Sequence, residues 1–290
     1  MKIRIIIILL AIFSLGSAFS QNSFQKDFFN AMQSSQYEEV QKILEKWEKD
    51  SPNDIEMYIG YFNYYLQRDV HSNLTLGQMK SGQYGIYNDV QYNMEDVKTG
   101  LSYLDKALIL APDRLDVYFG KSSVLMQTEN YSELTNTIIE FFNRSSINKN
   151  MWLWSNNAPI ESLGAKGETV LIDGVKDYLV DMFYQFEGNK SYIKTIIEKT
   201  IILYPDNVIG LNLAAYYYMT ANEHNKAIEV LLKAHKIDPS DYIIIGNLAR
   251  AYEITEDYDN ARKYYTSLTK LSNADEKARG EEGLKRLEGK

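Results

Sequence analysis

The sequence predicts an all-α fold of stacked helical hairpins, an α-solenoid, from three observations. Hydrophobic residues make up 45% of the 290-residue chain and charged residues 24%, which is typical of a folded protein and argues against wholesale disorder. Four of the five prolines follow helical-looking runs and precede a short polar side chain: Pro52, Pro112, Pro205 and Pro239. Pro205 and Pro239 lie 34 residues apart, and the other intervals equal one or two such periods plus 26 or 25 residues. A fixed period indicates repeats, so about six hairpins are expected, two of them interrupted by inserts.

The first twenty residues have the three regions of a secretory signal peptide. MKIR is positively charged, IIIILLAIFSL is apolar, and Ala18 and Ser20 are small residues ahead of a cleavage point at Gln21. The alternative is an uncleaved membrane anchor, but the apolar run is shorter than the roughly 20 residues that span a bilayer. We expect cleavage near Ser20-Gln21 and a periplasmic or secreted mature chain without stable membrane insertion.

Composition and motifs exclude several classes of site. The chain has no cysteine, which excludes disulfides, thiolate metal sites and a cysteine nucleophile. Its net charge is −8 and it lacks a basic cluster, so nucleic acid is an unsuitable partner. No His pair has metal-ligand spacing, and no H-E-x-x-H, P-loop or G-x-S-x-G motif occurs. We therefore expect no enzymatic activity, no cofactor and no metal.

Two consecutive 34-residue units, from Val208 and from Tyr242, carry the repeat most clearly. In the first, small and large apolar residues recur in a fixed order: Leu211, Ala214, Ala215, Tyr218, Ala227, Leu231, Ala234 and Pro239. This order resembles the tetratricopeptide repeat family, whose pattern is W-x2-L-G-x2-Y, then A-x3-F, then P. The resemblance is strong over 208–275 and weaker elsewhere. It implies a right-handed solenoid, in which each proline closes one hairpin and the next polar residue caps the following helix.

Along the chain the prediction assigns five segments after the signal peptide at 1–20. These are an N-terminal array at 21–148, an insert within it at 69–94, a connecting insert at 149–173, a C-terminal array at 174–275 and a capping helix at 276–290. The first insert is rich in glycine, asparagine and tyrosine, and the second holds Trp152 and Trp154. The favoured interpretation is that these aromatic residues fill a gap between hairpins, and the alternative is that they contact a ligand.

The resemblance also implies a concave groove lined by places 2, 5, 9, 12 and 13 of each first helix. Transferred by register, and with Asn247 added beside Arg250, the candidate peptide-binding residues are Phe29, Met32, Asn63, Phe119, Met126, Tyr178, Met182, Asn212, Tyr216, Met219, Asn247 and Arg250. Aromatic, methionine and asparagine side chains suit a peptide, because they supply area, adaptability and hydrogen bonds. We predict a non-catalytic scaffold that binds a protein or extended peptide. The alternative is an extracytoplasmic protein that binds a glycan or small ligand through Trp152 and Trp154.

Overall fold

The computed structural model describes residues 23–78 and 84–290, and helices dominate this part of the chain. The all-α class is therefore confirmed. The chain divides into two compact units, the first ending at Phe186 and the second comprising Glu187–Lys290. The segment 149–173, which the sequence assigned to a connection between arrays, lies within the first unit. The predicted signal peptide at 1–20 lies outside the described residues.

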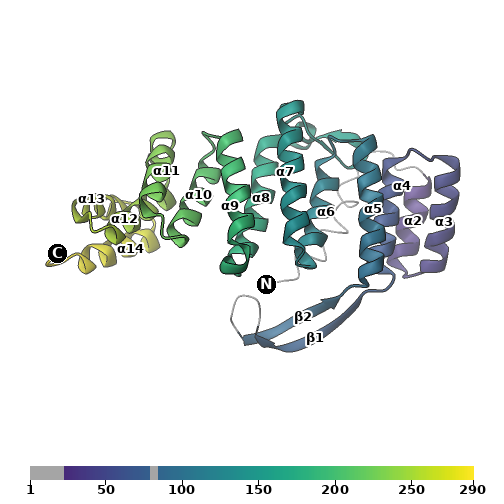
Figure 1. The fold of residues 1–290 in the computed structure, drawn as a ribbon, viewed down its shortest axis with the longest axis horizontal. Helices are drawn as coiled ribbons and strands as arrows, with labels where there is room; N and C mark the ends of the chain where they lie inside the picture. Colours follow the sequence, from purple (N-terminus) through teal and green to yellow (C-terminus); the bar gives the residue numbers. More distant parts are fainter. Residues whose placement is uncertain (1–22, 79–83) are drawn as a thin grey trace. The chain divides into compact units, whose positions relative to one another are not determined.

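The first unit is a series of helical hairpins in which neighbours along the chain pack together (Figure 1). Its helices are α2 (Ser23–Gln33), α3 (Tyr37–Asp50), α4 (Ile55–Gln67), α5 (Met94–Leu110), α6 (Leu115–Gln127), α7 (Tyr131–Asn148) and α8 (Gly167–Phe183). We call α2, α4 and α6 the first helices of this unit, because each opens a hairpin. A lone hairpin cannot bury its apolar side, so the stack provides the core.

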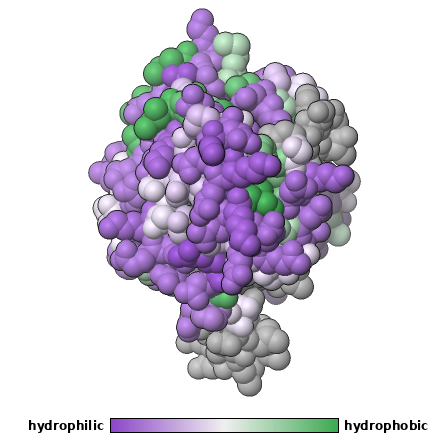
Figure 2. Space-filling view, turned by 90° about the vertical axis from the view of Figure 1, so that its right-hand side faces the viewer, coloured by the Kyte–Doolittle hydropathy of each residue, from purple (hydrophilic) through white to green (hydrophobic). Residues whose placement is uncertain are grey.

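Trp47 shows how one hairpin is joined to the next. It stands where the repeat usually has a small residue, and it is fully buried beside Phe28 and Leu44. Its indole Nε1 donates to Asp54 Oδ2 at 2.9 Å, while Asp54 Oδ1 accepts from the backbone N–H of Glu56 at 3.0 Å. Asp54 thus caps the start of α4 and binds α3 at the same time. Figure 2 views this unit from its α2–α3 end, whose coloured surface is largely hydrophilic, as a terminal repeat requires.

The first insert is a β-hairpin between α4 and α5 (Figure 1). Strands β1 (His71–Gln78) and β2 (Tyr84–Gln91) pair antiparallel, with His71 opposite Gln91 and Gln78 opposite Tyr84. At its base, Asn93 Nδ2 donates to Asp69 Oδ2 at 2.9 Å. The helical period did not predict these strands, because the insert lacks that period and strand pairing satisfies its backbone instead.

The second insert, between α7 and α8, is short and compact. It comprises β3 (Leu153–Trp154), η1 (Ser155–Asn157), β4 (Ala158–Pro159) and η2 (Ile160–Leu163). Leu153 pairs with Pro159 and Trp154 with Ala158. Asn156 and Asn157 both have positive φ, 55° and 57°, a conformation that asparagine tolerates better than most residues. This tight reversal keeps the insert folded against the unit.

The second unit repeats the hairpin plan. Its helices are α9 (Phe186–Leu203), which begins at the division, α10 (Val208–Thr220), α11 (His224–Ile237), α12 (Tyr242–Ile254), α13 (Tyr258–Thr269) and α14 (Ala274–Arg286). Ala215, Ala234, Ala249 and Ala261 lie in its core and let neighbouring helices approach. Asp241 caps α12 by accepting from two backbone N–H groups. The last helix, α14, lies where the sequence analysis placed a capping helix at 276–290, and it packs on α12 and α13.

Candidate functional site

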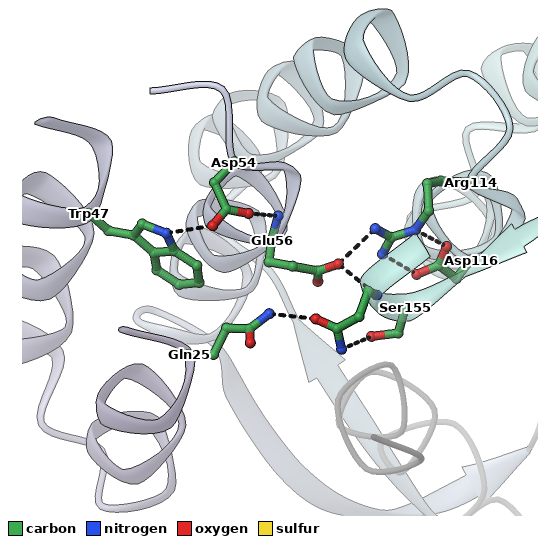
Figure 3. Close-up of polar contacts among 8 residues, drawn as sticks. Gln25, Trp47, Asp54, Glu56, Arg114, Asp116 and Ser155 are labelled. Carbon is green, nitrogen blue, oxygen red and sulfur yellow. Dashed lines mark hydrogen bonds and ion pairs between the residues drawn. The ribbon is translucent and has the colours of Figure 1, made fainter. Parts of the chain in front are cut away.

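A buried ionic cluster ties the start of α4 to the start of α6 (Figure 3). The guanidinium of Arg114 is fully buried and donates through Nε and Nη2 to the two carboxylate oxygens of Asp116, each at 2.8 Å. Its Nη1 donates to Glu56 Oε1 at 2.7 Å. Glu56 and Asp116 are also buried, at 5% and 0% exposure. One cation therefore holds two carboxylates that lie 60 positions apart in sequence.

The charges of this cluster are unequally compensated. Asp116 receives two hydrogen bonds from Arg114, whereas Glu56 receives one and its second oxygen, Oε2, is buried with no partner. Burial raises the pKa of Glu56, although the neighbouring Arg114 opposes this rise. Glu56 is thus the carboxylate that would gain most from an additional donor.

The second insert supplies a further donor to Glu56, at Oε1, and it crosses the three first helices α2, α4 and α6. The backbone N–H of Asn156 donates to Glu56 Oε1 at 2.9 Å, and Gln25 Nε2, on α2, donates to Asn156 Oδ1 at 2.9 Å (Figure 3). The Trp154 ring meets the Phe119 ring of α6 edge to face at 6.0 Å. We call residues 153–156 the crossing segment, because they contact α2, α4 and α6.

The candidate groove residues of the first unit do not form one open surface. Met32, Asn63 and Met182 are buried in the interior, at 7%, 3% and 0% exposure. Phe119 lies between the rings of Trp154 and Tyr178, and its carbonyl oxygen accepts from the Tyr178 hydroxyl at 3.2 Å. The other two, Phe29 and Met126, are half-buried.

Both tryptophans of the second insert pack against α6. Trp152 is fully buried and meets Tyr118 edge to face at 6.1 Å, and Trp154 is half-buried against Phe119. The indole nitrogens of both rings are buried without a hydrogen-bond partner. This arrangement favours gap filling between hairpins over direct ligand contact.

The second unit presents a row of polar side chains on three helices. Asn247 Nδ2, on α12, donates to Asn212 Oδ1, on α10, at 2.8 Å. Arg279 Nη2, on α14, donates to Asn247 Oδ1 at 3.5 Å. All three residues are half-buried, so the row is accessible from one side. The sequence indicated Asn212 and Asn247 but missed Arg279, which lies in the charged helix beyond the last repeat.

Exposed groups flank this amide row on α10 and α12. Tyr216 is 54% exposed, and the Arg250 side chain is 52% exposed. Met219 is half-buried and packs against the core. Tyr216, Arg250 and the row thus provide aromatic area, positive charge and amide groups on the helices that the sequence indicated.

Glu253 fixes α14 beside the row. Its carboxylate accepts from Arg286 Nε at 3.0 Å, from Arg250 Nη1 at 3.1 Å and from the Tyr265 hydroxyl at 2.5 Å. Arg286, together with the Tyr265 and Arg250 hydrogen bonds, lowers the pKa of Glu253 to about 2. The carboxylate therefore stays ionised at neutral pH and holds the helix that carries Arg279.

A separate hollow of about 340 Å³ lies on the first unit. It is lined by Tyr37, Glu38, Gln41, Tyr64, Arg68, Asp69 and Asp96. Arg68 forms two hydrogen bonds to the Asp96 carboxylate, and its guanidinium lies 4.6 Å from the centre of the Tyr65 ring. Because Arg68 and Asp96 neutralise each other, the hollow offers no uncompensated cation to an anionic ligand.

Two further properties concern residues 23–78 and 84–290 only. Within these ranges no group of three or more His, Cys, Asp or Glu side chains could hold a metal ion. In the same part of the chain, none of the helices combines the length and the apolar character needed to cross a membrane.

Comparison with known proteins identifies the repeat. The model of the tetratricopeptide repeat family matches residues 210–241 and 244–275, and no curated protein sequence matches the chain. Among solved structures, TTC0263 of Thermus thermophilus, a TPR protein, is 14% identical, with 66% of this chain and 92% of that chain covered and a TM-score of 0.39. YrrB, described as a TPR protein with an unusual peptide-binding site, is 14% identical, with coverage of 83% and 97% and a TM-score of 0.43. PilW, a type IV pilus biogenesis factor, is 9% identical, with coverage of 89% and 99% and a TM-score of 0.41. The matched residues coincide with the hairpins α10–α11 and α12–α13, so these two hairpins are the part of the chain that the tetratricopeptide repeat model identifies.

Proposed function

We propose that the protein is a non-catalytic scaffold that binds an extended peptide segment of a protein partner across α10, α12 and α14. Stacked helical repeats of this class serve in general as protein-interaction surfaces. The observation that carries the proposal is the hydrogen-bonded row of Asn212, Asn247 and Arg279 on three neighbouring helices.

The chemistry of the row matches a peptide backbone. A side-chain amide has two donor hydrogens and a carbonyl oxygen with two lone pairs, of which the row uses only part. An extended peptide presents alternating N–H and C=O groups, so it can pair with successive amides. Tyr216 supplies area for an apolar side chain, and Arg250 can receive a carboxylate of the partner.

We propose an extracytoplasmic location for this scaffold, which rests on the signal-peptide pattern of residues 1–20. Expression of the full chain in a secreting host, followed by mass spectrometry of the exported protein, tests the location. A mature N-terminus at Gln21 supports it, whereas an intact chain retained in the cytoplasm contradicts it.

The peptide site is tested by selection and substitution. A random peptide display library is screened for peptides that bind the full chain. The dissociation constant of the tightest-binding peptide is then measured. Because a net hydrogen bond contributes about 1 kcal/mol, the double variant Asn212→Ala/Asn247→Ala should weaken binding roughly 10- to 30-fold. Asn225→Ala, at an exposed position of α11, is the matched control and should leave affinity unchanged. Selected peptides that bind the double variant as tightly as the wild-type chain would refute this site.

A further inference from the structure

The first unit holds a short segment of its own chain, which reverses direction at Asn156 and Asn157, in the way that a repeat surface holds a peptide. The crossing segment, 153–156, contacts α2 and α4 through residues 131 and 100 positions away in sequence, and α6 through Phe119, which is 35 positions from Trp154. In the second unit the corresponding helices α10 and α12 keep Tyr216 and Arg250 about half exposed. The two units therefore differ in whether the chain itself covers their first helices.

An aromatic contact anchors the crossing segment at one end. Trp154 meets Phe119 edge to face at 6.0 Å, and Phe119 in turn meets Tyr178 edge to face at 6.3 Å. Edge-to-face pairs of this kind contribute beyond the area that they bury. Phe119 and Tyr178 thus form a receptor for an aromatic side chain.

Hydrogen bonds anchor the segment two residues later. Asn156 donates its backbone N–H to Glu56 and accepts at Oδ1 from Gln25, both at 2.9 Å. Gln25 and Glu56 are buried, at 4% and 5% exposure, so these bonds form where water is largely excluded. The requirement at this position is a backbone donor together with a side-chain acceptor, which asparagine provides.

We propose that the first-helix face formed by Gln25, Glu56 and Phe119 is a peptide-binding site that the crossing segment fills as an internal ligand. The site selects a segment with an aromatic residue followed, two positions later, by an asparagine that turns the chain with a positive φ, as Asn156 does at 55°. While the insert is in place, this face is closed to other peptides of that chemistry. The proposal is independent of the peptide site on the second unit.

The insert is fixed at both ends, where Trp152 and Ile160 are buried, and it is less buried at Trp154 and Asn156 between them, which allows its middle to be displaced. Trp152 is fully buried, and the Leu153 backbone N–H donates to the Asp113 carbonyl oxygen at 2.8 Å. Trp154 and Asn156, by contrast, are half-buried. A competitor would therefore replace the contacts of Trp154 and Asn156 and leave Trp152 in the core.

A peptide added in trans tests the proposal. The probe is a fluorescein-labelled peptide with the sequence of residues 151–160, MWLWSNNAPI. Fluorescence anisotropy measures its binding to the wild-type chain and to the variant Trp154→Ala/Asn156→Ala. This variant vacates the ring site and the amide site of the face, because it removes the Trp154 ring and the Asn156 Oδ1 acceptor, and it keeps Gln25, Glu56 and Phe119. We expect the probe to bind this variant at least tenfold more tightly than the wild-type chain, and a probe with alanine at the same two positions not to bind. Equal binding to both chains, or none to a folded variant, would overturn the proposal.

A second measurement detects displacement of the crossing segment in a chain that keeps Trp154 and Asn156. The chain has no cysteine, so Ser155→Cys introduces a single thiol at a position that is 7% exposed. Saturating probe should accelerate labelling of this thiol by a maleimide, whereas labelling of Asn222→Cys, at an exposed turn, should not change. Unchanged labelling at Ser155→Cys would show that the insert is not displaced. The variant Asn212→Ala/Asn247→Ala should bind the probe as the wild-type chain does, which separates this site from that of the second unit.

Discussion

Removal of Arg114 should destabilise the first unit more than any other single charge change. In Arg114→Met the apolar stem is retained, but the carboxylates of Glu56 and Asp116 remain at 5% and 0% exposure without their cation. Breaking a buried ion pair by removing one partner costs about 3–5 kcal/mol, because an uncompensated charge stays in the interior. That is a large share of the roughly 5–15 kcal/mol that stabilises a typical domain.

The distribution of tryptophan makes this loss measurable in the first unit alone. All three tryptophans, Trp47, Trp152 and Trp154, lie before Phe186 and none lies in Glu187–Lys290. Urea unfolding followed by tryptophan fluorescence therefore reports the first unit, whereas far-UV circular dichroism reports both. With a urea slope of about 2 kcal/mol per M, the fluorescence midpoint should fall by about 2 M.

Arg144→Met is the matched control for this experiment. Arg144 also binds an aspartate with two hydrogen bonds, to Asp113 at 2.8 and 3.0 Å, but its side chain is 27% exposed. Exposed pairs contribute about 1 kcal/mol or less, so the control midpoint should fall by at most about 0.5 M. If Arg114→Met shifts the midpoint no more than Arg144→Met does, the reasoning about buried charge is refuted.

The hairpins could be predicted because the information for them is local and periodic. Pro205 and Pro239 lie 34 residues apart, and alanine recurs at the same interval at Ala215 and Ala249 and at Ala227 and Ala261. The structure forms the hairpins α10–α11 and α12–α13 over these residues. The cap at Asp241 likewise follows from a residue adjacent to its helix. A period identifies such elements without knowledge of distant contacts.

The contents of the first-helix face could not be predicted in the same way. Glu56 meets Arg114 across 58 positions and Asn156 across 100, and no periodic pattern encodes such pairs. Register alone therefore placed Phe119 on an open groove, although Trp154 covers it. Arg279 is different, since it lies 32 positions after Asn247 and a search beyond the last repeat at near-repeat spacing would have found it.

Two further predictions concern the second unit. Because the pKa of Glu253 falls from 4.5 to about 2 on folding, its bond to Arg286 contributes stability that is present above pH 4.5 and lost as the pH falls toward 2. Thermal melts followed by circular dichroism should show this loss, at most about 3 kcal/mol, and Glu253→Gln should remove this part of the pH dependence. Gly283→Ala places a Cβ 2.3 Å from the Tyr265 ring and should cost about 1–3 kcal/mol, whereas Gly188→Ala, in open space on α9, should be neutral or stabilising. Equal effects of the two glycine substitutions would contradict the close approach of α14 to α13.

The covalent connection of the crossing segment to the first unit determines how tightly a partner must bind in order to displace it. A segment joined to its site by a short connection acts at an effective concentration on the order of 1 mM. A free peptide at micromolar concentration must therefore bind the vacated face about a thousandfold more tightly than residues 153–156 do in order to displace half of them. The probe titration measures this tether. The ratio of the probe's affinities for the vacated and the filled face, multiplied by the dissociation constant of the segment, approximates the effective concentration of the insert.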